Sequence, residues 1–344
     1  MEREAIFDLV CNRRHFLRNL GLGLGTVAVA SQTGLPSLFA KEIYPAGKIT
    51  CLISQKPGAG YDILARGISP YLTQYLRAVS RGAKGGSIVV KNEPAAGGQR
   101  AYSAVFKAKP DGNTICIFDI GFATETLMSK LDFDIQKFTY LIRINFTTRI
   151  LVTGKNGFAN WGEMVKFAKQ KELKWGVGAM GRAIHIDSII VKEETGLATR
   201  FIPFGGTAEN MNALLRGDIH VAMASEGSVS GLIDAGEIRV LTQFAETSDH
   251  PGVPSIKELG YPALSGKLGG HRFLITPPGL PKDIGNTLTS AFKMALSDKD
   301  FQAWAKKNNI PLNPVYGDEA DKLAKNIIRY YQEDLRPVLK KYLD

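Results

Sequence analysis

Four glycine-rich segments are the part of the sequence whose residue types and spacing could take part in chemistry. Glycine lets backbone N–H groups approach a ligand closely, and each segment directly precedes a predicted helix. The unpaired N–H groups and the dipole at a helix N-terminus attract anions. Together the segments favour a site for a small anion, although any one of them is also typical of a plain strand-to-helix turn. They are residues 57–60, 95–98, 176–181 and 205–207.

Charged side chains flank these segments. Arg149 and Arg182 can bind a carboxylate through paired N–H donors, and His185 stands at the predicted start of a helix, within reach of a ligand. Asp62 and Glu209 lie in the first turns of their predicted helices, where they stabilise the dipole but compete with an anionic ligand. An anion must then be held by N–H groups or by bridging water. The alternative is that these residues do not bind a ligand. The arginines then face solvent, and the histidine has hydrogen-bond partners within the protein.

Apolar runs and amphipathic stretches must position these residues. Their succession predicts strand, helix and strand, which indicates an α/β fold with mostly parallel sheets flanked by helices. A core of this size usually divides, so two lobes are expected. In such sheets ligands bind beyond the carboxyl ends of the strands, where the glycine-rich segments lie. The predicted strands are 48–53, 87–91, 114–118, 149–152, 173–177, 201–204, 219–224 and 238–241.

The predicted helices connect these strands. One begins near Tyr61, and others cover 99–107 and 161–171. Pro70 lies inside the first helix and predicts a kink or an irregular turn there. Beyond Gly270 the apolar repeat predicts helices without strands, which pack on the first lobe.

The sequence lacks the common motifs of catalysis and of nucleic-acid or metal binding. It contains no third glycine for a dinucleotide loop, no phosphate-binding loop ending in Gly-Lys-Ser/Thr, no His-Glu-x-x-His and no Gly-x-Ser-x-Gly. The net charge is +10, but the basic residues are scattered and form no stripe for nucleic acid. No cofactor and no metal site are therefore expected. Cys51 and Cys116 lie in predicted strands, and a disulfide between them requires those strands to be neighbours.

The N-terminal segment has the pattern of a targeting signal. Paired arginines, Arg13 and Arg14, precede Phe16-Leu17-Arg18 and then a glycine-rich apolar run. This resembles a twin-arginine export signal. We predict that residues 1–40 form this signal, with cleavage after Ala40, and exclude them from the fold. The alternative is a chance pair of arginines before a membrane anchor.

Short motifs also follow one another in a fixed order along almost the whole chain after residue 40. They are Pro57-Gly58-Ala59-Gly60-Tyr61-Asp62, Asn92-Glu93-Pro94-Ala95-Ala96-Gly97-Gly98, Pro110-Asp111-Gly112, the stretch 178–185, Pro203-Phe204-Gly205-Gly206, Val253-Pro254-Ser255 and Pro277-Pro278-Gly279. In this order they resemble the substrate-binding receptors of tripartite tricarboxylate transporters, the Bug-type proteins. Ala59 and Tyr61 depart from the glycine and threonine of the family pattern, which affects the expected ligand more than the fold.

The resemblance implies a two-lobed periplasmic-binding-protein fold of type II, the Venus flytrap, with residues 43–148 plus 270–344 in one lobe and 149–269 in the other. It implies a periplasmic receptor that captures a mono-, di- or tricarboxylate between its lobes and delivers it to membrane permease subunits, without catalysis. The expected ligand-binding residues, which include Arg149, are Gly58, Ala59, Gly60 and Asp62 on one side and Ala179, Arg182, His185, Gly205 and Gly206 on the other.

Two other functions fit the same sequence. One is a solute-binding protein of another transporter or of a sensor system, which binds an amino acid or an inorganic oxyanion. The other is an exported enzyme on a bilobed fold, which turnover of a bound acid or a purified cofactor would reveal.

Overall fold

The computed structural model describes residues 44–80 and 85–343. The predicted export signal and its cleavage site lie outside the described residues. Among the described helices, none combines the length and the apolar character that crossing a bilayer requires.

Ten strands form in the described part of the chain. The predicted strand 173–177 is confirmed residue for residue. The strands are β1 Ile49–Ile53, β2 Ile88–Asn92, β3 Thr114–Asp119, β4 Thr139–Gly154, β5 Leu173–Val177, β6 Thr199–Pro203, β7 Val221–Ser225, β8 Ile238–Gln243, β9 Gly269–Thr276 and β10 Val315–Tyr316.

Helices follow most of these strands, and the predicted helix 99–107 is also confirmed residue for residue. The α-helices are α1 Gly60–Val79, α2 Gln99–Lys107, α3 Glu125–Met128, α4 Trp161–Ala168, α5 Ala183–Thr195, α6 Thr207–Arg216, α7 Ser230–Asp234, α8 Lys282–Ser297, α9 Lys299–Lys307, α10 Gly317–Arg329 and α11 Arg336–Leu343. Shorter helical turns are η1 Ala95–Gly98, η2 Ile120–Thr124, η3 Ile135–Lys137, η4 Glu226–Ser228, η5 Pro262–Leu264 and the π-helical η6 Tyr330–Asp334.

Helix α1 shows how the sequence sets these elements. Leu64, Ile68, Leu72 and Leu76 recur at intervals of four and are buried against the sheet. Pro70 is exposed, and the helix continues through it to Val79 rather than ending there. The missing proline N–H removes one intrahelical hydrogen bond, and the buried apolar face holds the helix together across that gap.

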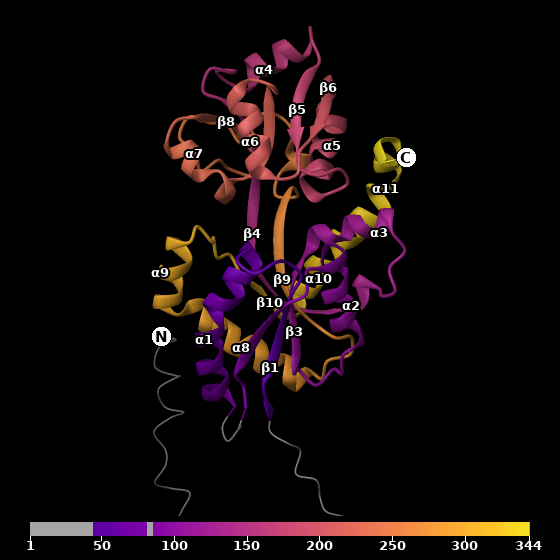
Figure 1. The fold of residues 1–344 in the computed structure, drawn as a ribbon, viewed down its shortest axis with the longest axis vertical. Coiled ribbons are helices and arrows are strands. Elements are labelled where there is room, and N and C mark those ends of the chain that lie inside the picture. The colour runs from indigo at the N-terminus through magenta and orange to yellow at the C-terminus, as the bar shows by residue number, and fades with distance from the viewer. Residues whose placement is uncertain (1–43, 81–84, 344) are drawn as a thin grey trace, which may run out of the picture. The chain divides into compact units, whose positions relative to one another are not determined.

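The strand–helix–strand units are parallel, as predicted. Strand β1 lies between β2 and β3, and β5 lies between β6 and β7, all in parallel register. Strands β4 and β9 add antiparallel pairings that the sequence did not predict, so both sheets are mixed. The fold is α/β with helices flanking the sheets (Figure 1).

Strand β4 belongs to both sheets. Residues 139–148 pair with β9, and residues 149–154 pair with β7 and β8. Figure 1 shows β4 and β9 running between the group of helices α4–α7 and the group that contains α1, α2 and α8. The sequence predicted only 149–152 of β4 and helices alone beyond Gly270, which was wrong at β9 and at the short strand β10. Both strands are buried on both faces for much of their length, so the alternation that marks a strand is absent.

Three apolar clusters fill the interior. One packs α1, α8 and α9 on one face of the sheet that contains β1, and one packs α6 against β4, β7 and β8. The third contains Phe118 and Tyr140 together with Trp175 and Ile186, so it spans both sheets. The two groups of elements therefore share part of their core.

The cysteine pairing depended on neighbouring strands, and β1 and β3 are indeed neighbours. Cys51 lies opposite Ile115, however, and Cys116 lies opposite Leu52, so the two thiols project to opposite faces of the sheet. Both cysteines are free and buried. Burial raises the pKa of the Cys51 thiol to about 12.

Candidate functional site

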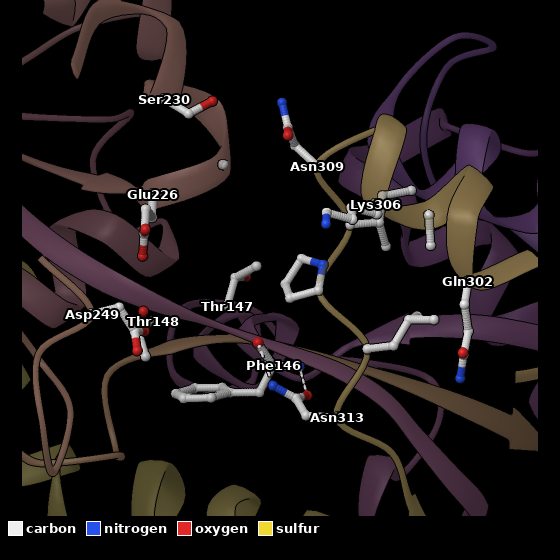
Figure 2. Close-up of a pocket in the computed structure, with 15 residues that line it drawn as sticks. Phe146, Thr147, Thr148, Glu226, Ser230, Asp249, Gln302, Lys306, Asn309 and Asn313 are labelled. Carbon is white, nitrogen blue, oxygen red and sulfur yellow. Dashed lines mark hydrogen bonds between the residues drawn. The ribbon is translucent and has the colours of Figure 1, made fainter. Parts of the chain in front are cut away.

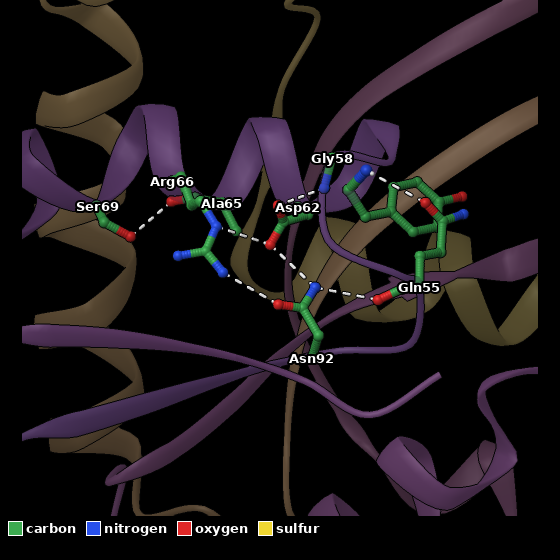
Figure 3. A network of polar contacts seen from close by, with 8 residues as sticks. Gln55, Gly58, Asp62, Ala65, Arg66, Ser69 and Asn92 are labelled. Atoms are coloured by element: carbon green, nitrogen blue, oxygen red, sulfur yellow. Dashed lines mark hydrogen bonds and ion pairs between the residues drawn. The ribbon is translucent and has the colours of Figure 1, made fainter. Parts of the chain in front are cut away.

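Asp62 organises the first glycine-rich segment (Figure 3). Its carboxylate is 3% exposed and accepts hydrogen bonds from the Gly58 N–H at 2.9 Å, Arg66 Nε at 2.9 Å and Asn92 Nδ2 at 2.9 Å. Burial alone raises the pKa of Asp62, but these three hydrogen bonds outweigh it and lower the pKa below its ordinary value. Asp62 is therefore charged and holds the loop, and the Gly58 N–H is already bonded.

The same arrangement recurs in two other segments. Gly181 N–H donates to His185 Nδ1 at 2.9 Å, and Gly205 N–H donates to Glu209 Oε2 at 2.9 Å. In each case the acceptor stands four residues after the glycine, inside the first turn or two of the following helix. His185 is 1% exposed, and burial lowers its pKa, so it is the neutral imidazole that accepts at Nδ1.

The helix N-termini remain available to an anion. Ala59, Arg182 and Gly206 occupy the N-cap positions of α1, α5 and α6, and none of them makes a side-chain capping hydrogen bond. The Tyr61 N–H of α1 reaches Gln55 Oε1 only at 3.4 Å. Helix termini without a side-chain cap satisfy their N–H groups with water or with a ligand.

The second segment follows a left-handed backbone path. Ala96, Gly97 and Gly98 have φ values of 51°, 63° and 95°. A Cβ on Gly98 would lie 2.6 Å from Cβ of Ser54, so the close approach to β1 requires glycine. A Cβ on Gly97 would lie 2.8 Å from Arg182 Nη2. The guanidinium of Arg182 therefore lies against this loop.

Arg182 joins two of the predicted segments. It directly precedes α5 and forms an ion pair with Glu125 of α3. A Cβ on Gly121 of η2 would lie 3.0 Å from Cβ of Ala183, the first residue of α5. The N-terminus of α5 thus meets η1, η2 and α3, and the structure brings Arg182 to the second glycine-rich segment as a half-exposed cation that already has one acid partner.

Arg149 lies in a different environment. It is 4% exposed, its Nε donates to Asp187 Oδ2 at 2.7 Å, and it also donates to the hydroxyl of Ser225. Burial lowers the pKa of the Arg149 guanidinium, but the charge of Asp187 and the hydrogen bond to it outweigh burial and raise the pKa. Its charge is therefore balanced within the protein, and a role in ligand binding stays a prediction.

Ala179 and Gly206, two further predicted positions, have simpler surroundings. The Ala179 carbonyl accepts from the Arg182 N–H at 3.1 Å and closes the turn before α5. Gly206 has an extended backbone with φ of 179°, and nothing lies within 4 Å of a Cβ built on it. The fourth segment is therefore open at Gly206.

Sequence reasoning missed Arg272, which lies on β9 beside the first segment. Its guanidinium lies over the ring of Tyr61, 4.8 Å from the centroid, and a Cβ on Gly60 would lie 3.4 Å from Nη2. Because the region beyond Gly270 was predicted as helix, nothing placed this arginine at the carboxyl end of β1. The only available signal was an arginine directly before the apolar run Phe273–Thr276.

A separate cavity of about 620 Å³ contains none of the predicted site residues. Figure 2 shows Glu226 and Asp249 on one side of it and Lys306 and Asn309 on the other. The amide of Gln243 donates to Glu226 at 3.1 Å and to Asp249 at 3.2 Å, which holds the two carboxylates together. Lys306 and Asn309 are exposed, so the opposite wall is not a preformed polar site.

No group of three or more histidine, cysteine, aspartate or glutamate side chains in the described part of the chain could hold a metal ion.

Comparison with known proteins decides the family. The model of the tripartite tricarboxylate transporter family receptors matches residues 76–337. The chain belongs to this family. A curated relative, a UPF0065 protein of the gbd 5′ region of Cupriavidus necator, is 24% identical to this receptor over 310 residues, which cover 88% of this chain and 90% of the relative.

Solved structures agree on the fold of this receptor. A TctC solute-binding protein from Polaromonas, determined without ligand, superposes with a TM-score of 0.75 at 22% identity and covers 87% of this chain and 99% of its own. An R. palustris protein determined with adipate superposes with a TM-score of 0.68 at 24% identity and covers 86% of this chain and 98% of its own. The fold is that of the periplasmic binding proteins, as the motif order predicted.

Proposed function

We propose that this receptor captures a small carboxylate in the periplasm and delivers it to the permease subunits of a tripartite transporter. The observation that carries the proposal is the α5 N-terminus. It has no side-chain cap and lies against η1 and η2. These two turns follow β2 and β3 of one sheet, whereas α5 follows β5 of the other. A ligand held there contacts both sides at once, as a binding protein requires.

We further propose that residues 43–148 with 270–344 form one lobe and 149–269 the other, joined by β4 and β9. Gly58, Gly205 and His185 then shape the site, because their groups are bonded within the loops. The N–H groups of the first turns of α1 and α5 hold the ligand carboxylate, together with Arg182. The adipate found in the R. palustris relative is the kind of ligand that this arrangement suits.

Isothermal titration tests the proposal with the chain from residue 41 onward. The probes are succinate, adipate and citrate, with butyrate and hexanoate as monocarboxylates, alanine as an amino acid, and sulfate as an inorganic oxyanion. We expect saturable binding of at least one carboxylate, with no turnover, and a higher melting temperature with the same ligand. Binding of alanine or sulfate alone would instead favour a receptor of another class.

Replacing Ala183 by proline sharpens this experiment. Proline at the first position of a helix removes one N–H without breaking the helix, and the extended backbone of Arg182 tolerates a following proline. We expect carboxylate affinity to fall about 10-fold, the loss of one hydrogen bond to a charged group. The matched control is Lys282→Pro at the start of α8, which lies outside the site and should leave affinity unchanged.

A further inference from the structure

Three polar residues lie side by side on neighbouring strands at the edge of the candidate site. Arg272 of β9 is opposite Asp119 of β3 and opposite Asn145 of β4. The β4–β9 register shifts between Arg143 and Asn145, and from Asn145 onward the pairing is regular. Side chains of directly opposed residues in such a regular stretch project to the same face, with Cβ atoms about 5 Å apart. The first turn of α1 covers this face, because the ring of Tyr61 lies under the Arg272 guanidinium.

Arg272 differs from the other arginines near the site because it has no acidic partner among the described residues. Arg149 pairs with Asp187, Arg182 with Glu125 and Arg66 with Asp62. In the described part of the chain, no carboxylate oxygen lies within 4 Å of an Arg272 nitrogen. The side chain is half-buried, so its charge is neither paired with an acid nor fully solvated. The guanidinium lies over the Tyr61 ring, and an arginine in this position can donate paired N–H groups to a planar acceptor.

Asp119 does not neutralise this arginine. One of its carboxylate oxygens accepts the Gly121 N–H at 3.0 Å, and the hydroxyl of Tyr61 is a second partner of this carboxylate. These bonds direct Asp119 toward η2 and α1. Its charge nevertheless limits how much negative charge the region accepts, which fits one acidic group at Arg272 and not several.

Asn145 supplies the second, independent observation. It is 0% exposed, and neither Nδ2 nor Oδ1 has a hydrogen-bond partner in the structure. A buried amide without partners destabilises the folded protein, because it has lost its hydrogen bonds to water. An amide in this state directly beside an unpaired arginine is what a polar ligand group would satisfy.

We propose that Arg272 and Asn145 form a specificity subsite that binds the second acidic group of the ligand. The first carboxylate is held at the helix N-termini, so this inference rests on the proposed function. The receptor then prefers a dicarboxylate to the monocarboxylate of the same length. Arg272 binds one carboxylate edge-on, and the Asn145 amide donates to the same group.

Titration of paired acids tests the subsite. The probes are succinate, glutarate and adipate, each compared with the monocarboxylate of equal length, namely butyrate, pentanoate and hexanoate. In the wild type we expect the best dicarboxylate to bind at least about 10-fold more tightly than its partner. In Arg272→Met we expect that advantage to disappear, with monocarboxylate affinity unchanged within about 2-fold. Arg272→Lys should restore part of it, because the charge returns without the planar pair of donors.

Asn145→Leu separates binding from folding. Leucine removes both unsatisfied groups, so we expect the unliganded protein to melt at the same or a higher temperature, while affinity for the best dicarboxylate falls. The charge control is Arg216→Met, an exposed arginine that pairs with Asp218. This variant should bind the acids as the wild type does.

Each alternative result contradicts the inference in its own way. Equal losses for mono- and dicarboxylates in Arg272→Met would show that Arg272 holds the common carboxylate, which overturns the subsite and leaves the proposed function standing. Unchanged dicarboxylate affinity in this variant would overturn the subsite as well. A folded wild type that binds none of the six acids would overturn the subsite, and one that also fails to bind citrate would overturn the proposed function as well.

Discussion

At the scale of single residues, some residues predicted to contact the ligand hold their own loops through hydrogen bonds. The side chains of Asp62, His185 and Glu209 each accept the N–H of a glycine four residues earlier. The sequence indicated that Asp62 and His185 belong to the site and that Glu209 competes with an anionic ligand there, because all three follow glycine-rich segments. It could not show that the glycine N–H groups are already bonded, because that depends on the backbone conformation of each turn. It also could not show that Asn92 joins Asp62 from another strand. Whether they also contact a ligand stays a prediction.

His271 gives the protein a specific response to acid. It is 4% exposed and packs between Phe146 and Phe273. Burial, with smaller contributions from Arg143 and Arg149, lowers its pKa from 6.5 to about 3. Between these values the unfolded chain takes up a proton that the folded protein does not. The contribution to stability is therefore complete above about pH 6.5 and is lost as the pH falls, by up to about 1.4 kcal/mol per pH unit.

Chemical denaturation from pH 7 to pH 4.5 measures this effect in wild type and in His271→Phe. Phenylalanine keeps the ring stacking and cannot take up the proton, so we expect its stability to fall less steeply with acid. His250→Gln is the control, because His250 pairs with Glu226 in another part of the molecule. Parallel curves for wild type and His271→Phe would contradict the assignment.

At the scale of elements, the helices and the parallel strands could be predicted from apolar spacing, and β4 and β9 could not. Helix α2 and strand β5 have clear boundaries in turn residues and in polar flanks. Strand β9 begins with Gly269-Gly270 and carries His271 and Arg272, which do not resemble a buried strand. Its strand conformation is set by the partners on both sides, β3 and β4, which are distant in sequence.

The second glycine-rich loop requires glycine at position 98, and this requirement can be tested. Gly98→Ala places a Cβ 2.6 Å from Ser54 and forces alanine to a φ of 95°. We expect a loss of about 2 kcal/mol or more in unfolding free energy, since strain and overlap act together. Gly206→Ala is the matched control, because its backbone is extended and its surroundings are empty. Thermal melts that show equal stability for the two variants would disprove the role of Gly98.

At the scale of the whole molecule, the family resemblance is confirmed by the family model, and the fold by solved structures. The order of motifs carried that prediction, because each motif alone is a common turn. The identity of the ligand could not follow from the same motifs. Arg272 and Asn145, which we propose to select it, come together only when β9 pairs with β4.

The lobe boundaries can be tested by excision. Thr148 of β4 lies opposite Gly269 of β9, so an Asn-Gly turn can join them in place of residues 149–268. We expect the shortened protein to melt cooperatively at a lower temperature than the full chain, because one apolar cluster spans both sheets. Circular dichroism and calorimetry measure this. A broad melt without a cooperative transition would show that the two parts fold only together.

The pairing of β9 between β3 and β4 also sets an order of events during synthesis. The ribosome releases β1 to β3, then β4 and every strand of the second sheet, and only afterwards β9. Until residue 276 has emerged, the two edges that β9 joins have no strand between them. The second sheet can therefore assemble on the far half of β4 while the first is still open, so the part of the protein encoded in the middle is complete before the part encoded at both ends.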